Sequence, residues 1–326
     1  MKFVRGILNI TPNPDGCVLT LGNFDGIHLG HQQIVSLVKQ QSDRLGIPSA
    51  VLFFEPQPRE YFTHTRSPAR LTTLHEKYSF MNKLGIDYLY CLRFSDRFAD
   101  ISADDFITEI LLAKFNVRHL VVGDDFRFGK GREGSFETIE NYCKKTGTFS
   151  VEQAPSYIID NQRVSSTLIR EALAEARIKD AEKMLGRPYS ITGKVVHGQQ
   201  LGRKIGFPTA NIDLNRTVLP VSGVYAISAK VDDRILYGIA NIGVRPTVNG
   251  TQPRLEAYLF DYSGDLYGRR LTVQIWKKIR NEQKFPNIEE LREQIEKDKL
   301  FAQNLFSGSV TDPVSSTTHH LKEMGL

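Results

Sequence analysis

The chain has 326 residues, of which 40% are hydrophobic, and a formal net charge of +5 at pH 7. This length is about twice that of a usual domain, so we expect two domains, each with its own core. Lys and Arg are dispersed among Asp and Glu, which argues against nucleic-acid binding. The three cysteines form no CxxC pair, and no apolar run reaches the roughly 18 residues of a membrane span. We therefore expect a cytoplasmic protein with reduced thiols and no contact with membranes.

The first half of the chain alternates short apolar runs with segments of helical periodicity. The predicted strands are 17–21, 50–54, 88–92, 119–122 and 150–153. The predicted helices are 32–44, 74–84, 103–115 and 136–145. Such alternation predicts a Rossmann-like α/β domain, a parallel sheet with helices on both faces, whose ligands bind beyond the carboxyl ends of the strands.

A glycine-punctuated motif, Gly26-Ile27-His28-Leu29-Gly30-His31, follows the first predicted strand and opens the first predicted helix. Imidazoles at a helix N-terminus suit a polyphosphate, because free backbone N–H groups and the positive end of the helix dipole face the same anion. Two other interpretations remain open. His28 and His31 could be a metal pair, although no third ligand lies nearby in sequence, or core residues of a buried turn.

A second helix start carries hydroxyl groups, at Ser165-Ser166-Thr167, with Arg163 just before it. Hydroxyls, N–H groups and a guanidinium group can bind a triphosphate together. The alternative is an ordinary Ser/Thr N-cap beside a solvated arginine. The letters GxGxxG occur at 129–134, but Asp124 to Phe128 separate them from the preceding strand, so this segment is predicted to be a loop.

After Gly186-Arg187-Pro188 the pattern becomes β-rich, with Gly, Asp and Asn turns between the strands. The predicted strands are 189–196, 223–231, 235–242, 255–260 and 271–279, and a helix follows at 288–304. This pattern predicts a small antiparallel β-barrel with a C-terminal helix. The predicted domains are therefore 1–186 and 187–306, followed by a mobile, Ser/Thr-rich tail at 307–326 in which His319-His320 is incidental.

The β-rich half contains a second glycine motif, Gly206-Phe207-Pro208-Thr209-Ala210-Asn211. A hydroxyl and a carboxamide two residues apart can hold a metal-bound nucleotide. The alternative is a plain proline-containing turn. No GxxxxGK[ST] sequence is present, so any kinase activity is not of the P-loop kind.

Seven motifs, in the same order, resemble those of the bacterial bifunctional riboflavin kinase/FMN adenylyltransferases, also called FAD synthetases. Four motifs resemble those of the adenylyltransferase half of the family: NFDGIHLGH (23–31), FEPQP (54–58), GDDFRFG (123–129) and SSTLIR (165–170). Three motifs resemble those of the riboflavin kinase half: GRKIGFPTAN (202–211), NIGVRPT (241–247) and LEAYLFD (255–261). The resemblance runs from about residue 19 to about residue 306. It implies two Mg²⁺-dependent reactions: riboflavin plus ATP gives FMN, and FMN plus ATP gives FAD and pyrophosphate.

For the adenylyltransferase, the resemblance implies catalytic roles for His28 and His31, which would bind the ATP phosphates and offset charge in the transition state. The FMN phosphate is itself the nucleophile and is ionised near pH 7, so no general base is needed. Other ATP and phosphate contacts would come from Gly26, Gly30, Asp125, Arg163, Ser165, Ser166 and Thr167. Flavin contacts would come from Phe54, Pro56 and Pro58, since proline and aromatic faces suit a flat ring.

For the kinase, the nucleophile is a neutral alcohol, so a general base is useful, and the resemblance implies Glu256. The alternative is a solvent-facing strand residue, because Glu256 alternates with Leu255 and Ala257. Thr209 and Asn211 would hold Mg²⁺ and the ATP phosphates, while Gly202 and Gly206 would let the loop backbone approach them.

The chain departs from the family at Gln57 and Tyr258, where histidine is common, so flavin contacts at these two positions stay open. Three rival functions are a nucleotidyltransferase with another substrate, a flavin sensor without turnover, and a nucleic-acid-binding protein. The first leaves the barrel motifs unexplained, the second conflicts with two complete sets of reactive residues, and the third conflicts with the dispersed charge. Oligomeric state, rates and metal preference do not follow from the sequence.

Overall fold

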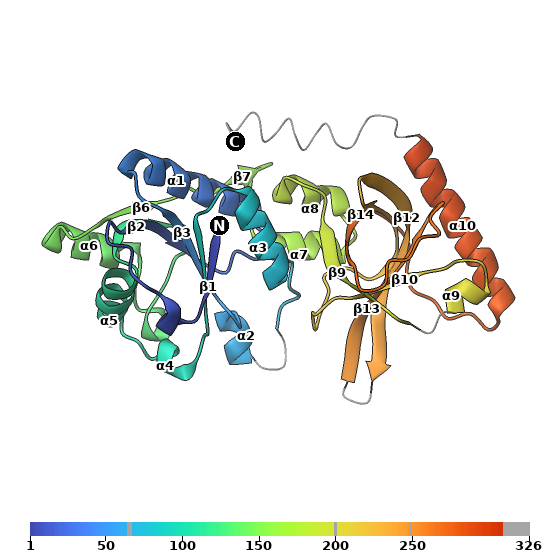
Figure 1. The fold of residues 1–326 in the computed structure, drawn as a ribbon, viewed down its shortest axis with the longest axis horizontal. Helices are drawn as coiled ribbons and strands as arrows, with labels where there is room; N and C mark the ends of the chain where they lie inside the picture. Colours follow the sequence, from blue (N-terminus) through green and yellow to red (C-terminus); the bar gives the residue numbers. More distant parts are fainter. Residues whose placement is uncertain (64–66, 199–200, 248–249, 309–326) are drawn as a thin grey trace. The chain divides into compact units, whose positions relative to one another are not determined.

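The structure is a computed structural model that describes residues 1–63, 67–198, 201–247 and 250–308 (Figure 1). The chain forms two compact units. Met1–Pro68 and Leu74–Ser165 make up the first, which we call the sheet unit. Ala69–Thr73 and Ser166–Leu326 make up the second, the barrel unit. The predicted tail and His319-His320 lie largely or wholly outside the described residues.

The sheet unit is built on six parallel strands in the order β1-β4-β3-β2-β5-β6. Their bounds are β1 (Lys2–Arg5), β2 (Cys17–Leu21), β3 (Ser49–Phe54), β4 (Tyr88–Leu92), β5 (Val117–Val122) and β6 (Ser150–Gln153). The predicted parallel sheet is confirmed. Edge strand β1 was not predicted, because its four residues are mostly exposed and too short for a period to be read.

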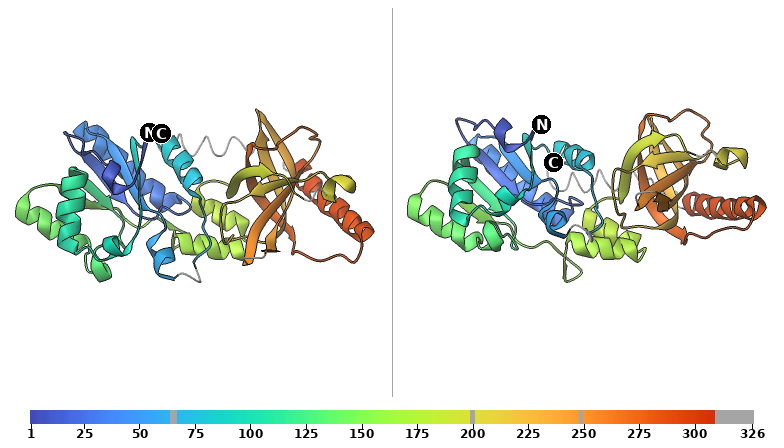
Figure 2. Two further views of the ribbon diagram at one scale, coloured as in Figure 1. Left: turned by 60° about the horizontal axis from the view of Figure 1, so that its bottom comes forward. Right: turned by 90° about the horizontal axis from the view of Figure 1, so that it is seen from below.

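Helices cover both faces of this sheet (Figure 2). They are α1 (Leu29–Leu45), α2 (Pro58–Thr63), α3 (Leu74–Lys83), α4 (Asp96–Ala99), α5 (Ala103–Asp105), the π-helix η2 (Phe106–Lys114) and α6 (Phe136–Thr146). Because side chains alternate along a strand, Val18 packs in one core with Val38 of α1, while Leu19 packs in another with Ile107 of η2. Short 3₁₀ turns, η1 (Ile7–Asn9) and η3 (Lys130–Arg132), and the hairpin β7 (Ile158–Ile159) and β8 (Gln162–Arg163) complete the unit.

The segment predicted as one α-helix over 103–115 is mostly a π-helix in the structure. It begins as a single α-turn and continues as a π-helix, in which the Phe115 N–H donates to the Ile110 carbonyl five residues earlier at 3.1 Å. The wider turn lets Phe106, Ile107, Ile110 and Leu111 all be buried against the sheet.

The barrel unit is a closed antiparallel barrel of six strands in the order β10-β13-β12-β11-β14-β9. The bounds are β9 (Ser190–Val196), β10 (Ala210–Asp213), β11 (Gly223–Val231), β12 (Arg234–Thr247), β13 (Gly250–Leu259) and β14 (Arg270–Arg280). Helix α9 (Leu201–Lys204) precedes β10, and α10 (Ile288–Ser307) follows β14. Asn287 caps α10 by accepting from the Glu290 N–H at 2.8 Å. The predicted barrel with a C-terminal helix is confirmed.

The barrel core takes residues from well upstream of the strands. Helices α7 (Ser166–Ala174) and α8 (Ile178–Leu185) contribute Ile169, Leu173 and Leu185, and the segment Ala69–Thr73 contributes Leu71. The buried Arg216 holds this segment by donating to the Arg70 and Leu71 carbonyls at 3.1 and 3.2 Å. The compact units thus divide between Ser165 and Ser166, upstream of the predicted domain boundary at 186/187. The boundary between the two functional domains stays a prediction.

Candidate active sites

Strand β2 lies at the point where the order of the parallel sheet reverses. From β2 the chain continues to β3 and then β4 on one side, whereas β5 and β6 lie on the other. In doubly wound sheets, ligands bind at the carboxyl ends of the strands beside such a reversal. His28 and His31 follow β2, and Asp125 follows β5, so the motif residues of the sheet unit gather at this edge.

The two histidines form one stacked pair at the start of α1. Their ring centroids are 3.7 Å apart with an interplanar angle of 21°. His28 is the N-cap of the helix, and its Nδ1 accepts from the His31 N–H at 3.3 Å. Gly30 keeps the pair close, because a Cβ at Gly30 would lie 3.3 Å from the His28 ring. Gly26 has φ +84°, a conformation that suits glycine in the tight turn before the helix.

Arg163 lies beside the two acids that follow β5. Its Nη2 pairs with the Asp124 carboxylate and lies 3.2 Å from Oδ1 of Asp125. Ser156 also donates to Asp124. Asp125 and Arg163 are thus brought together in the sheet unit. Ser166 and Thr167 begin α7 in the barrel unit, so their predicted role at the phosphates stays a prediction, as does that of Ser165.

An aromatic cluster lies where β3 and β4 end. Phe54 is buried and packs edge-on to Phe94 with centroids 5.6 Å apart. Pro56 follows a cis peptide bond and Pro58 begins α2. In α2, Phe62 is 63% exposed and lies edge-on to both Tyr61 and Phe94. An exposed ring on such a cluster can receive a flat apolar ligand, and Phe62 was not identified from the sequence.

Gln57 sits inside the same turn and is buried. Its backbone N–H donates to Glu60 at 3.0 Å, but its side-chain Nε2 has no hydrogen-bond partner among the described residues. The Gln57 carboxamide therefore retains a buried donor that makes no hydrogen bond within the described residues.

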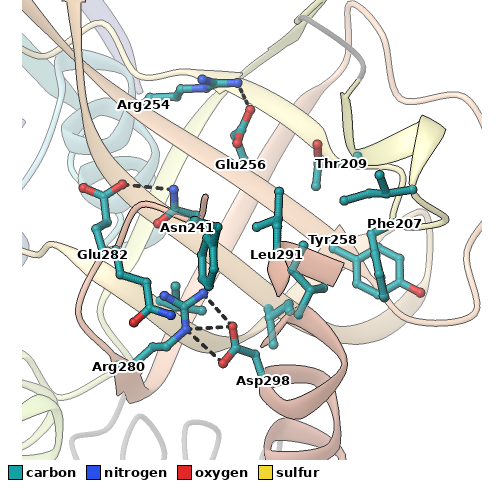
Figure 3. Close-up of a pocket in the computed structure, with 17 residues that line it drawn as sticks. Phe207, Thr209, Asn241, Arg254, Glu256, Tyr258, Arg280, Glu282, Leu291 and Asp298 are labelled. Atoms are coloured by element: carbon teal, nitrogen blue, oxygen red, sulfur yellow. Dashed lines mark hydrogen bonds and ion pairs between the residues drawn. The ribbon is translucent and has the colours of Figure 1, made fainter. Parts of the chain in front are cut away.

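The barrel unit contains a cavity of about 340 Å³ on the outer face of the barrel, enclosed by α9, the 205–209 loop, the 282–285 loop and α10 (Figure 3). Its apolar wall includes Phe207, Tyr258, Leu291 and Ile295. Phe207 and Tyr258 meet edge-on with centroids 5.4 Å apart. Glu256, Thr209 and Gly202 also line the cavity, which brings together three predicted kinase residues.

The strand register explains why these residues meet. Asn211, Glu256, Asn241, Val224 and Arg280 are successive cross-strand partners on β10, β13, β12, β11 and β14. Neighbours in such a row share one face of the sheet. Their sequence neighbours, such as Leu255 and Ala257, point into the barrel core. Glu256 is therefore on the outer face, as its alternation predicts, but this face is part of the cavity wall.

The glycines of the second motif permit close backbone approach. A Cβ at Gly202 would lie 2.3 Å from the Phe207 carbonyl oxygen and 3.3 Å from Oγ1 of Thr209. Gly206 has φ +91°, which suits glycine. Gly198, which was not identified from the sequence, matters in the same way, because a Cβ there would lie 2.2 Å from the Asn211 carboxamide.

Three polar pairs lie around the cavity, and Figure 3 shows them on different sides of it. Arg254 pairs with Glu256, and its Nη2 also donates to Oδ1 of Asn211 at 3.2 Å. Asn241 donates to Glu282 at 3.0 Å. Arg280 and Asp298 form a two-pronged ion pair in which Asp298 of α10 is only 2% exposed. That buried pair ties α10 to β14 and so fixes the far wall of the cavity.

The parallel sheet gathers its motif residues at the carboxyl ends of the strands, and the barrel has a cavity surrounded by polar pairs. These two features define a protein that combines a nucleotide-binding domain with a second binding domain. A family model described as FAD synthetase matches residues 10–168, and one described as riboflavin kinase matches residues 185–306. No described helix is both long and apolar enough to cross a membrane. Kinases and adenylyltransferases of these families use ATP, typically with a divalent metal ion.

Relatives of known function match nearly the full length. The bifunctional riboflavin kinase/FMN adenylyltransferases of Escherichia coli (strain K12) and Haemophilus influenzae are each 46% identical over 308 residues, 94% of this chain and 98% and 100% of theirs. That of Pseudomonas fluorescens is 46% identical over 310 residues, 95% of this chain and 99% of its own. The chain belongs to the family of bifunctional riboflavin kinase/FMN adenylyltransferases.

A solved structure supports the same fold. The crystal structure of a macrolide-efflux protein from Streptococcus pneumoniae is similar with a TM-score of 0.79 and 30% identity, covering 93% of this chain and 99% of that one. The family resemblance and the fold predicted from the sequence are therefore confirmed. The roles of the individual site residues stay predictions.

Proposed function

We propose that the barrel unit phosphorylates riboflavin to FMN, and that the sheet unit then adenylylates FMN to FAD with release of pyrophosphate. The proposal follows the order of the two family models along the chain. The observation that carries it is the placement of Glu256, Thr209 and an aromatic wall around one cavity. We further propose that residues 187–306 supply the kinase chemistry and residues 1–186 the adenylyltransferase chemistry.

In the kinase, Glu256 accepts the proton of the ribityl 5′-hydroxyl as that oxygen attacks the γ-phosphorus of ATP. The O–H bond breaks, an O–P bond forms, and ADP leaves with its bridging oxygen. Phe207, Tyr258 and Leu291 offer the apolar surface that a flat isoalloxazine ring requires. Arg280 and Asp298 keep α10 against the barrel, so that this surface stays closed on the side of the helix.

The donor set of the kinase site fits a divalent cation with hard oxygen ligands, and we propose Mg²⁺. Thr209 offers a hydroxyl and Asn211 a carboxamide oxygen, which already accepts a hydrogen bond from a cationic group, Arg254. Within the described residues, no cluster of three or more His, Cys, Asp or Glu side chains competes as a metal site. When bound, Mg²⁺ neutralises charge on the ATP phosphates.

In the adenylyltransferase, His28 and His31 bind the phosphates of ATP, and the N-terminal N–H groups of α1 add positive potential. The FMN phosphate oxygen attacks the α-phosphorus, and pyrophosphate leaves. Asp125 and Arg163 lie at the next strand end and contact the nucleotide. Phe62, together with Pro56 and Pro58, faces the flavin, whereas the buried Phe54 supports the cluster from below.

The proposal is tested by product analysis on the full chain. Riboflavin, ATP and Mg²⁺ should yield FMN first and FAD later, and FMN supplied directly should yield FAD and pyrophosphate. Omitting the metal should stop both reactions. We also propose that the protein works in the cytoplasm on these small molecules, without nucleic acid or membrane. A chain that converts FMN but not riboflavin would contradict the kinase assignment alone.

A further inference from the structure

Arg254 connects two residues that the kinase reaction needs. Its Nη2 donates both to the Glu256 carboxylate and, at 3.2 Å, to Oδ1 of Asn211. The connection follows from the fold, because Arg254 and Glu256 are two residues apart on β13 and therefore share a face. Asn211 is the cross-strand partner of Glu256 on β10. Figure 3 shows Arg254 and Glu256 on the side of the cavity near Thr209.

One of the two oxygens that Arg254 contacts, Oδ1 of Asn211, is also a proposed ligand of the divalent cation. A metal ion bound to Oδ1 of Asn211 would lie within a few ångströms of the guanidinium group. Two cations at such a distance repel each other, and the repulsion is twice as large for a divalent ion as for a monovalent one. Arg254 and the metal therefore cannot both hold their best positions.

The surroundings of Arg254 allow it to move. Its side chain is 32% exposed, and that of Glu256 is 22% exposed, so the pair lies at the mouth of the cavity and not in the core. By contrast, the Asp298 partner of Arg280 is buried, and that pair is fixed. A guanidinium group that leaves Glu256 on the arrival of metal-bound ATP can bind a phosphate oxygen instead.

We propose that Arg254 competes with the divalent cation for Asn211 and pairs with Glu256 until the metal–nucleotide complex displaces it toward the phosphates. The inference rests on the proposed kinase function and on its metal site. It makes Arg254 a positioning residue: in the absence of nucleotide it engages the base, and once displaced it leaves Glu256 to accept the substrate proton. The base thus becomes available only with the second substrate in place.

The test measures the affinity of the full-length chain for Mn²⁺ in the absence of nucleotide, with electron paramagnetic resonance as the detection method. Arg254→Met removes the charge and keeps most of the length, so Mn²⁺ should bind roughly tenfold more tightly. Arg254→Lys keeps the charge, so its affinity should stay near that of the unaltered chain. Arg269→Met is the matched control, because it removes the same charge from an exposed pair with Asp232 outside the cavity.

A kinetic split adds a second readout. In Arg254→Met the Mg²⁺ concentration for half-maximal riboflavin phosphorylation should fall about tenfold, while the KM for ATP rises because a phosphate contact is lost. Melting curves without metal show whether each variant is folded.

Unchanged or weaker Mn²⁺ binding by a folded Arg254→Met variant would overturn the inference and leave the kinase assignment standing. Equal tightening in Arg269→Met would also overturn it, because the effect would then be one of net charge. If the unaltered chain binds no Mn²⁺ and forms no FMN, the proposed kinase site fails together with the inference.

Discussion

The two units build their candidate sites in different ways. In the sheet unit, the candidate site residues lie in short segments that each follow a strand, such as 23–31 after β2 and 123–129 after β5. In the barrel unit, the candidate site joins the segment 202–209 to a row of single residues on five strands, Asn211, Glu256, Asn241, Val224 and Arg280, aligned by register. A loop site can be recognised as a contiguous motif. A row across a barrel exists only when the barrel has closed.

The units also differ in how continuous they are in sequence. The sheet unit is formed by the first 165 residues, apart from Ala69–Thr73, which leaves it to join the barrel unit. The barrel unit adds this segment, α7 and α8 to its six strands. The stability of the barrel should therefore depend on residues upstream of its own strands, and this dependence yields the largest effect we predict.

A fragment that starts at Ser166 should be more stable than one that starts at Arg187, both ending at Gly308. The shorter fragment loses Ile169, Leu173 and Leu185, which are at most 1% exposed. Burial of one such side chain contributes roughly 1.5–3 kcal/mol, so the free energy of unfolding should fall by about 4 kcal/mol or more. Urea unfolding followed by the fluorescence of Trp276 measures the difference.

The two fragments are matched, because both lack Ala69–Thr73 and both keep the cavity. The longer one should phosphorylate riboflavin without forming FAD. Equal unfolding midpoints would show that α7 and α8 add nothing to the barrel core, and would support an independent domain that starts at residue 187.

His31→Ala should stop FAD formation and leave FMN formation intact. His31 stacks on His28 at the start of α1, and loss of one contact that stabilises the transition state costs about 3 to 4 kcal/mol, a factor of several hundred in kcat. Single-turnover assays with FMN and ATP measure the loss. The control His75→Ala removes an exposed histidine from α3 of the same unit. Normal FAD synthesis by folded His31→Ala would refute a role at the phosphates.

Glu256→Gln should have the converse effect, with riboflavin phosphorylation reduced by roughly a hundredfold or more, the usual contribution of a positioned base. Gln keeps the size and removes the proton-accepting carboxylate. Added FMN should still be adenylylated, and Glu293→Gln on the exposed side of α10 should change neither rate. If FMN production by Glu256→Gln is unchanged, Glu256 is only a cavity-wall residue.

Local signals in the sequence predicted most of the framework. Strands 17–21, 88–92, 150–153 and 223–231 were predicted with the bounds that the structure has, and all but the polar strand 150–153 are largely apolar runs. The helix predicted at 288–304 begins where the structure has it, after the N-cap Asn287 and with Glu289 and Glu290 in its first turn, which are local signals of a helix start. The motif at 23–31 lies at the carboxyl edge of the sheet, and Gly202 and Thr209 of the motif at 202–211 line the cavity, while the roles of these residues stay predictions.

What the sequence could not predict depends on distant partners. Strand β10 is four residues long, was not predicted, and begins at Ala210 near the end of the second glycine motif; its pairing with β9 and β13 makes it a strand. Arg254 carried no signal of its own until register placed it beside Glu256 and Asn211. The move of Ala69–Thr73 to the barrel unit is fixed by the buried Arg216, 145 residues further along the chain from Leu71.

The smallest effect we predict concerns acid stability, and it separates the two units. In the sheet unit, His119 is 5% exposed and lies between Ser150 at 2.7 Å and Glu152 at 3.3 Å. Burial lowers its pKa below the ordinary value of 6.5, and the nearby Glu152 only partly opposes this, while Arg44 adds to it. Below pH 6.5 the unfolded chain therefore takes up a proton that the folded chain does not. The free energy of unfolding consequently decreases as the pH is lowered.

At pH 5.5 the loss relative to pH 7.5 should be at most about 1.4 kcal/mol, and His119→Gln should reduce it. The chain has a single tryptophan, Trp276, on β14, so its fluorescence follows the barrel unit, whereas circular dichroism also follows the helices of the sheet unit. The acid effect should thus move the urea transition seen by dichroism and leave that of Trp276 in place. The exposed His75→Gln should behave as the unaltered chain. The contrary outcome is a Trp276 transition that also shifts at acid pH in the unaltered chain and does not shift in His119→Gln. That outcome would show that the two units unfold as one cooperative unit.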